Sequence, residues 1–261
     1  MDFVKFYSNE KWKGLTNLTS MHNRISALTY SILLNAKMIP TWLEEEDIEI
    51  DKFNLFGEEY TIDDVKPEGY GIAKKKELLF CSHLADKIDK GIIERRLNHA
   101  NVFGNEWIPN FRNKHKQIIE DIRNGKDIES ILLETAYNVH YLQDALSVMH
   151  THAYFQEHHI EFEHYINDNY FKIAPYDNIV YHLRRNFVYV RDVDSLINWI
   201  GTKRKVAGYA GLRAVADYIN RQYATGYKVV EKSMEHGVAL DIALSVIATF
   251  NYYLIILDYI R

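Results

Sequence analysis

Helix-breaking residues are scarce in this chain, which leaves long uninterrupted stretches in which helices can form. Four prolines and twelve glycines are spread over 261 residues, and these two residue types are the least favourable in helix interiors. The regularly spaced turn residues of a β-sandwich or β-barrel are missing. We therefore predict an all-α fold, a single-domain multi-helix bundle over residues 1–261.

The composition is that of an ordinary globular protein, with 47% hydrophobic and 26% charged residues, and it excludes disordered and fibrous classes. The lone Cys81 cannot form an internal disulfide, and the opening MDFVKFYSNEKWKG lacks the apolar core of a secretory signal. Both features favour a cytoplasmic location. The apolar run 242–257 is shorter than the roughly 18 to 20 residues needed to cross a bilayer. We expect a buried helix there and no transmembrane segment.

Negative charge is concentrated in one segment. Residues 44–68 hold eleven carboxylates and two lysines, although the whole chain carries only −5. The sequence IEIDKFNLFGEEYTI within this segment alternates in part, so we interpret 44–70 as an acidic insertion, either a short hairpin or an irregular excursion. The rest of the chain offers no broad basic surface for nucleic acid, and a phosphodiester substrate would need a local site.

Two N-cap candidates mark helix starts, Ser20 and Asp127, and Gly125 marks a helix end. The first helix, which continues to about Met38, would turn His22 inward. No internal repeat or linker divides the chain. The further helices that we predict cover residues 72–90, 110–124, 127–151, 156–170, 178–189, 193–200, 206–233 and 237–260.

Histidines cluster in one part of the sequence, since six of the twelve lie between His140 and His164. His140 and Asp144 are four residues apart and so share a helix face, and Leu133 and Ala136 place that face in an apolar stripe. A buried carboxylate beside an imidazole is costly unless a divalent cation pairs with both. The spacing therefore predicts a buried metal site.

A second histidine and carboxylate pair follows. His159 and Glu163 repeat the four-residue spacing on the next predicted helix, and His150, rotated away from the first face, could serve a neighbouring ion. One such pair arises easily by chance, but the combination is more specific and indicates two adjacent metals. The histidines that lack a carboxylate in matching register are assigned to surface, cap or core positions: His115, His152, His158, His164, His182 and His236.

The motif HYLQD at 140–144, followed by Met149-His150 and by His159-x-x-x-Glu163, resembles the superfamily of zinc-dependent phospholipases C and fungal single-strand-specific nucleases. The segment SHLAD at 82–86 looks like that family's Ser-Trp-Ala-Asp, and His99 follows thirteen residues later. His22 matches the family's histidine on the first helix. The resemblance extends from His22 to Glu163.

The resemblance implies a multi-helix bundle of the phospholipase C/nuclease type that holds about two or three Zn²⁺ ions. One zinc would be held by Asp86, His99, His140 and Asp144, and Asp144 would bridge toward a second zinc near His22. Another zinc would be held by His150, His159 and Glu163. Asp89 and Glu94 are alternatives to Asp86, since they also precede His99. Family members are trimmed to an N-terminal tryptophan that binds the third zinc; this chain begins at Met1, and trimming to Trp12 would imitate them.

Paired divalent metals supply both the nucleophile and the positive charge that phosphate-ester hydrolysis needs. We therefore expect a zinc-dependent phosphodiester hydrolase in which Asp86 orients the attacking water. The substrate would be a phospholipid head group or a single-stranded nucleic acid or nucleotide. The alternative is a non-catalytic helical protein with structural metals. A carboxylate di-iron bundle is disfavoured, because Glu161 and His164 give one of the two Glu-x-x-His pairs required, as is a histidine-aspartate phosphohydrolase, because no His-Asp dipeptide is present.

Overall fold

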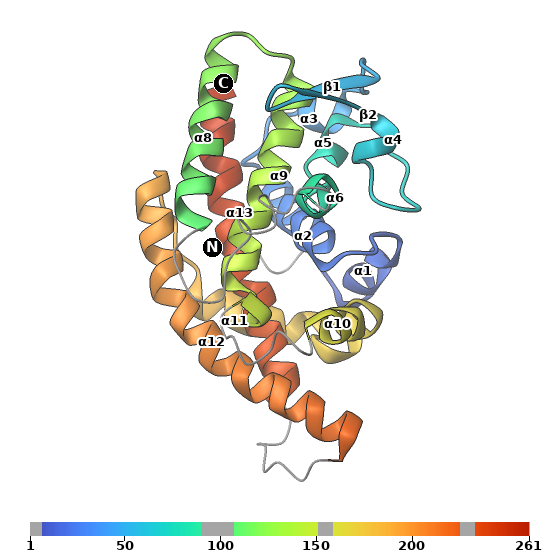
Figure 1. Cartoon of the computed structure of the whole chain (residues 1–261), viewed down its shortest axis with the longest axis vertical. Coiled ribbons are helices and arrows are strands. Elements are labelled where there is room, and N and C mark those ends of the chain that lie inside the picture. Colours follow the sequence, from blue (N-terminus) through green and yellow to red (C-terminus); the bar gives the residue numbers. More distant parts are fainter. Residues whose placement is uncertain (1–6, 90–106, 151–158, 225–232, 261) are drawn as a thin grey trace.

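The computed structural model describes residues 7–89, 107–150, 159–224 and 233–260, with the side chains of Met149 and His159 excepted. Helices dominate these ranges, and the sheet found in them is a two-stranded hairpin. The predicted all-α class is therefore confirmed (Figure 1).

The N-terminal half contains short elements around one long helix, and the C-terminal half contains long helices. The first group is α1 (Asn9–Lys13), η1 (Gly14–Asn17), α2 (Met21–Asn35), α3 (Trp42–Glu45), β1 (Lys52–Leu55), β2 (Glu58–Thr61), α4 (Ile62–Val65), α5 (Lys75–Leu78) and α6 (Leu84–Asp89). The second group is α8 (Trp107–Arg123), α9 (Ile128–Leu146), η2 (Val148–His150), α10 (His159–Ile173), α11 (Tyr176–Asn186), α12 (Val193–Tyr223) and α13 (Ser233–Ile260).

The two predicted N-caps are confirmed. The Ser20 hydroxyl accepts a hydrogen bond from the His22 backbone N–H, and the Asp127 carboxylate accepts one from the Ser130 N–H. Each side chain satisfies an amide that the first helical turn would otherwise leave without a partner. These caps fix where α2 and α9 begin, and both helices carry residues of the site described below.

Helix α13 forms the centre of the molecule and contacts α2, α9, α11 and α12 (Figure 1). With 28 residues and a mean hydropathy of 1.8 in its most apolar window, it is long and apolar enough to cross a membrane, yet that window is entirely buried inside the protein. The predicted buried helix is confirmed. The expectation that this segment is too short to span a bilayer is wrong, because the helix begins as early as Ser233.

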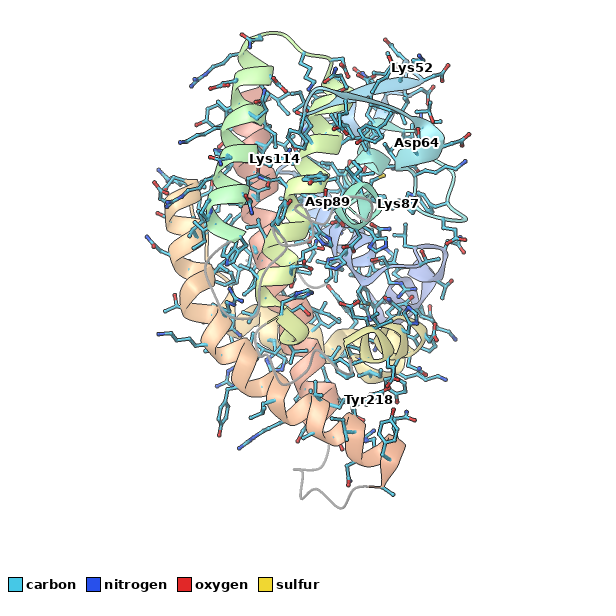
Figure 2. The ribbon with its side chains drawn as sticks, viewed as in Figure 1. Lys52, Asp64, Lys87, Asp89, Lys114 and Tyr218 are labelled. Carbon is cyan, nitrogen blue, oxygen red and sulfur yellow. The ribbon has the colours of Figure 1, made fainter. Side chains whose placement is uncertain are left out.

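The acidic segment folds into the antiparallel hairpin β1–β2, whose turn residues Phe56 and Gly57 both have positive φ. The hairpin is attached to α9, since the Phe56 N–H donates to Glu134 Oε1 over 2.9 Å and the Asn54 N–H donates to Ser130 Oγ over 3.1 Å. Lys114, labelled in Figure 2, lies 3.5 Å from the centre of the Phe56 ring. Of the two alternatives left open by the sequence, the structure has the hairpin.

Three predicted helix boundaries are wrong. The helix expected at 72–90 is broken into α5 and α6, because the intervening turn bonds to α2: Ser26 Oγ donates to Ser82 Oγ, and the His83 N–H donates to Asn23 Oδ1. The helix expected at 127–151 ends at Leu146. Helix α12 covers the helix expected at 193–200 and most of the one expected at 206–233, since the partly exposed residues between them stay helical and the helix ends at Tyr223.

Candidate metal centre

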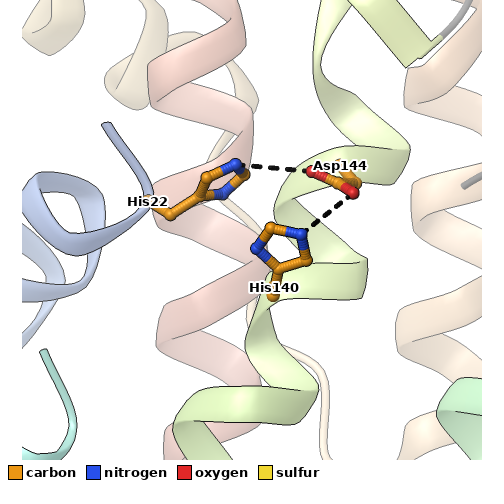
Figure 3. A group of neighbouring side chains, drawn as sticks. All are labelled: His22, His140 and Asp144. Carbon is orange, nitrogen blue, oxygen red and sulfur yellow. Dashed lines mark ion pairs between the residues drawn. The ribbon is translucent and has the colours of Figure 1, made fainter. Parts of the chain in front are cut away.

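His22, His140 and Asp144 form the centre of the site (Figure 3). The Asp144 carboxylate faces both rings, with His22 Nε2 at 3.4 Å from its Oδ1 and His140 Nε2 at 3.2 Å from its Oδ2. One ligand atom from each of the three residues lies within 4.8 Å of the others. His140 and Asp144 are each only 1% exposed, as the apolar stripe of this helix predicts. Imidazole nitrogen and carboxylate oxygen are donors that zinc accepts, so this group fits a divalent ion.

Asp86 joins the centre from the first turn of α6. Its Oδ1 lies 3.4 Å from His140 Nε2, and its Oδ2 lies 2.8 Å from His83 Nδ1. Asp89, an alternative ligand by sequence, instead accepts hydrogen bonds from the Tyr137 hydroxyl at 3.1 Å. Of these two carboxylates, Asp86 is therefore the one beside His140. Glu94 and His99 lie outside the described residues.

His150 lies beside the centre because α9 ends before it, at Leu146. Ser147 adopts an extended conformation (φ −67°, ψ 136°), and the short turn of η2 follows. His150 Nε2 then lies 3.6 Å from Asp144 Oδ1 and 3.9 Å from Glu163 Oε1, which comes from α10. The expectation that His150 points away from the face of Asp144 is wrong for this reason. The His159 backbone begins α10, but its side chain is outside the described part.

Electrostatics favour a cation at this centre. Burial alone would lower the pKa of His140, but the carboxylates of Asp144 and Asp86 outweigh burial and raise it well above 6.5. Burial would raise the pKa of Asp86, but His140 and His83 hold it well below 3.8. Burial, followed by the neighbouring His140, lowers the pKa of His22 to about 4. His22 is thus neutral near pH 7, and a divalent ion at the centre would take the place of the His140 proton.

Gln143 fixes the orientation of the His22 ring. Its side-chain nitrogen donates to the hydroxyls of Ser26 at 3.2 Å and Thr249 at 3.1 Å, so its Oε1 faces the His22 ring, where it lies 2.9 Å from Nδ1. Nδ1 therefore carries the ring proton, and the lone pair of Nε2 faces Asp144. A hydrogen bond to the far nitrogen is the usual way in which proteins orient a metal-binding histidine.

Two residues of the centre were not identified from the sequence. His83 stands three residues before Asp86, a spacing that brings side chains together on one turn of helix, but the SHLAD motif assigns no role to this histidine. Gln143 occupies the unspecified position of the HYLQD segment. Gln143 and His22 are 121 residues apart in the sequence, so no local spacing pattern reveals their contact.

The centre opens into a cavity of about 670 Å³. His22, His83, Asp86 and Glu163 lie in its wall beside apolar side chains such as Ile25, Ile160 and Val238. Trp12 is not among the residues that line the cavity; it is fully buried, and its Nε1 donates to the Ala174 carbonyl at 2.9 Å. A cavity with possible metal ligands in its wall and a volume suited to a small organic group is typical of a binding site.

No family model matches the chain, and no match was found among curated proteins or solved structures.

Proposed function

We propose that this protein is a zinc-dependent phosphodiester hydrolase whose active site is the centre around Asp144. The observation that carries the proposal is the convergence of His22, His140 and Asp144, with Asp86 and His150 in contact, next to a cavity whose wall includes His22 and Asp86. The donors are all imidazoles and carboxylates, the set used by catalytic zinc sites, whereas closed structural sites commonly contain thiolates.

Asp144 is suited to be shared between two ions. Its Oδ2 faces His140, and its Oδ1 faces both His22 and His150. One ion would be held by Asp86, His140 and Asp144, and a second by Asp144 with His22 or His150. Zinc ions bound by these residues would activate water at neutral pH and neutralise charge on the phosphate.

Asp86 would act on the water that attacks phosphorus. Its carboxylate is about a third exposed and lines the cavity, so it can reach both His140 and a substrate. With its pKa held well below 3.8, it is ionised near neutral pH and can accept a hydrogen bond from water. His83, at 2.8 Å, fixes the position of this carboxylate. Asp86 would therefore orient the nucleophile.

The resemblance to zinc-dependent phospholipases C and single-strand-specific nucleases supports the same chemistry and suggests two substrate classes. One is a phospholipid head group and the other a single-stranded nucleic acid or nucleotide. An assay panel of phospholipid vesicles, single-stranded DNA, RNA and a 3′-nucleotide, each with zinc-loaded protein, separates the two classes.

The proposal is tested with His140→Ala and Asp144→Asn against His236→Ala, which changes an exposed histidine on α13. We expect the first two variants to lose bound zinc and to lower hydrolysis of a chromogenic phosphodiester by more than about 100-fold, and the control to retain both. Loss of zinc without hydrolysis by the wild-type protein on any substrate of the panel would instead favour the alternative, a helical protein with structural metals. Unchanged zinc content and activity in both variants would exclude the site.

A further inference from the structure

One face of α13 forms part of the cavity wall. Val238, Asp241, Ile242 and Ser245 all line the cavity, and their spacing of three, four and seven residues places them on one side of a helix. Asp241 brings a carboxyl group to this wall, on a helix that contributes no residue to the metal centre. Nothing in the proposed ligand set uses it.

The two oxygens of Asp241 differ in their surroundings. Oδ2 accepts a hydrogen bond from the Val148 N–H at 2.8 Å, whereas Oδ1 is buried and has no hydrogen-bond partner among the described residues. The whole residue is 9% exposed. A buried polar atom without a partner costs free energy, so an atom kept in this state beside a cavity points to a ligand that supplies the missing bond.

No lysine or arginine is among the described residues that line the cavity, so no permanently cationic side chain there pairs with this carboxyl group. A carboxylate buried without a paired cation takes up a proton instead of remaining charged, and burial raises the pKa of Asp241 well above its usual value. Because Oδ2 already accepts a hydrogen bond, the proton belongs on Oδ1. The group that Asp241 offers to a ligand is therefore an O–H donor.

We propose that Asp241 is a substrate-binding residue that donates a hydrogen bond from Oδ1–H to a phosphoryl oxygen of the ester. This inference rests on the proposed function and adds a binding residue to it. A phosphodiester is an anion, and the cavity wall already contains Asp86, Glu163 and Asp168. A neutral donor binds an anionic oxygen without adding to this negative charge, whereas an ionised Asp241 would repel it.

The Asn variant separates the donor role from a charged role. In Asp241→Asn, the amide oxygen can accept from the Val148 N–H while the amide nitrogen donates into the cavity, so this variant reproduces a protonated aspartate. Asp241→Leu has similar size and no donor. Asp258→Asn, an exposed position on the same helix, is the matched control.

The test measures binding of inorganic phosphate to the zinc-loaded protein by calorimetry, together with kcat and KM on the best phosphodiester of the panel. We expect Asp241→Asn to remain within about threefold of wild type and Asp241→Leu to bind phosphate on the order of tenfold more weakly. If Asp241→Leu does not fold, Asp241→Ala takes its place.

The inference is overturned if Asp241→Asn loses phosphate binding as Asp241→Leu does, if neither variant changes it, or if the zinc-loaded wild type binds no phosphate. Failure of the proposed function looks different: the wild type would bind phosphate and respond to these variants without hydrolysing any phosphodiester. Binding and turnover therefore report on the two claims separately.

Discussion

At the scale of single residues, Gln143 connects the buried hydroxyls of Ser26 and Thr249 to the ring of His22. Without it, the ring loses its fixed orientation and its preferred tautomer. We predict that Gln143→Leu lowers zinc affinity about 10- to 100-fold, the effect usual for residues that orient a metal-binding histidine. Competition with a chromogenic chelator measures this change.

Gln117→Ala is the matched control for Gln143, since Gln117 is an exposed glutamine on α8. It should leave zinc affinity unchanged. Equal affinities for Gln143→Leu and wild type would show that the His22 ring does not take part in binding the ion.

Glu134 predicts a dependence of stability on pH away from the metal centre. Burial raises its pKa from 4.5 to about 7, although Lys126 and the Phe56 N–H act in the opposite direction. Between pH 4.5 and about pH 7, Glu134 keeps its proton in the folded protein but has lost it in the unfolded chain. The protonated Glu134 side chain therefore contributes fully to stability below about pH 4.5, and its contribution is lost as the pH rises through about 7. Glu134→Gln removes the titrating group and should remove this loss.

Urea denaturation at pH 5 and pH 8 measures the effect. The unfolding free energy of wild type relative to Glu134→Gln should fall between these two pH values, by an amount on the order of 2 kcal/mol. Glu120→Gln, at an exposed position on α8, is the matched control. A constant difference between wild type and Glu134→Gln would contradict the raised pKa.

At the scale of helices and turns, the close packing of α12 on η2 depends on Gly211. A Cβ atom at this position would lie 1.6 Å from Val148 Cγ2 and 2.3 Å from Val148 Cβ, and Val148 belongs to the turn that carries His150. We predict that Gly211→Ala displaces this turn, costs about 1–3 kcal/mol of stability and weakens zinc binding.

Gly201→Ala provides the control on the same helix. Gly201 is exposed, and a Cβ atom there meets nothing within 4 Å, so alanine should be neutral or stabilise the helix by up to about 1 kcal/mol. Thermal unfolding and chelator competition on both variants check the prediction. If Gly211→Ala behaved like Gly201→Ala, the packing of η2 on α12 would not determine the position of His150.

The sequence predicts helices well where a polar cap or an apolar period marks them. Ser20 and Asp127 mark the starts of α2 and α9, and the spacing from His140 to Asp144 predicts a shared, buried face, as observed. The prediction of helix boundaries fails where tertiary contacts determine where a helix ends. The break before α6 depends on bonds from Ser82 and His83 to α2, and the early end of α9 is accompanied by a bond from the Val148 N–H to Asp241.

The residues of the candidate site are also predictable from the sequence only where local spacing or a motif marks them. The pair His140 and Asp144 follows from helical spacing, the family resemblance names His22, Asp86 and His150 as well, and the structure places these three around the pair. His83 and Gln143 act through contacts with side chains of other elements or turns, so their roles become visible only when α2, α6 and α9 are packed together. The contribution of His99 and of the His159 side chain stays a prediction, since both lie outside the described part.

At the scale of the whole molecule, the centre joins elements that are distant in sequence. His22 comes from α2, Asp86 from α6, His140 and Asp144 from α9, and Glu163 from α10. An ion bound by these groups requires the folded arrangement, so it stabilises the folded state by mass action. We predict that zinc at about 100 times its dissociation constant raises the unfolding free energy by about 2.7 kcal/mol.

Thermal unfolding with increasing free zinc tests this coupling. The Tm of the wild type should rise with zinc and fall again with chelator, and the Tm of His140→Ala should not respond. A zinc-independent Tm in the wild type, or an equal response in the variant, would place any bound zinc elsewhere.

Elemental analysis of tag-free protein purified without chelators tests most directly whether these residues hold metal ions. We predict more than one zinc ion per chain in the wild type and a clear loss in Asp144→Asn, with circular dichroism showing that both are folded. Folded wild-type protein that contains no metal, and takes up none when zinc is added, would contradict the account.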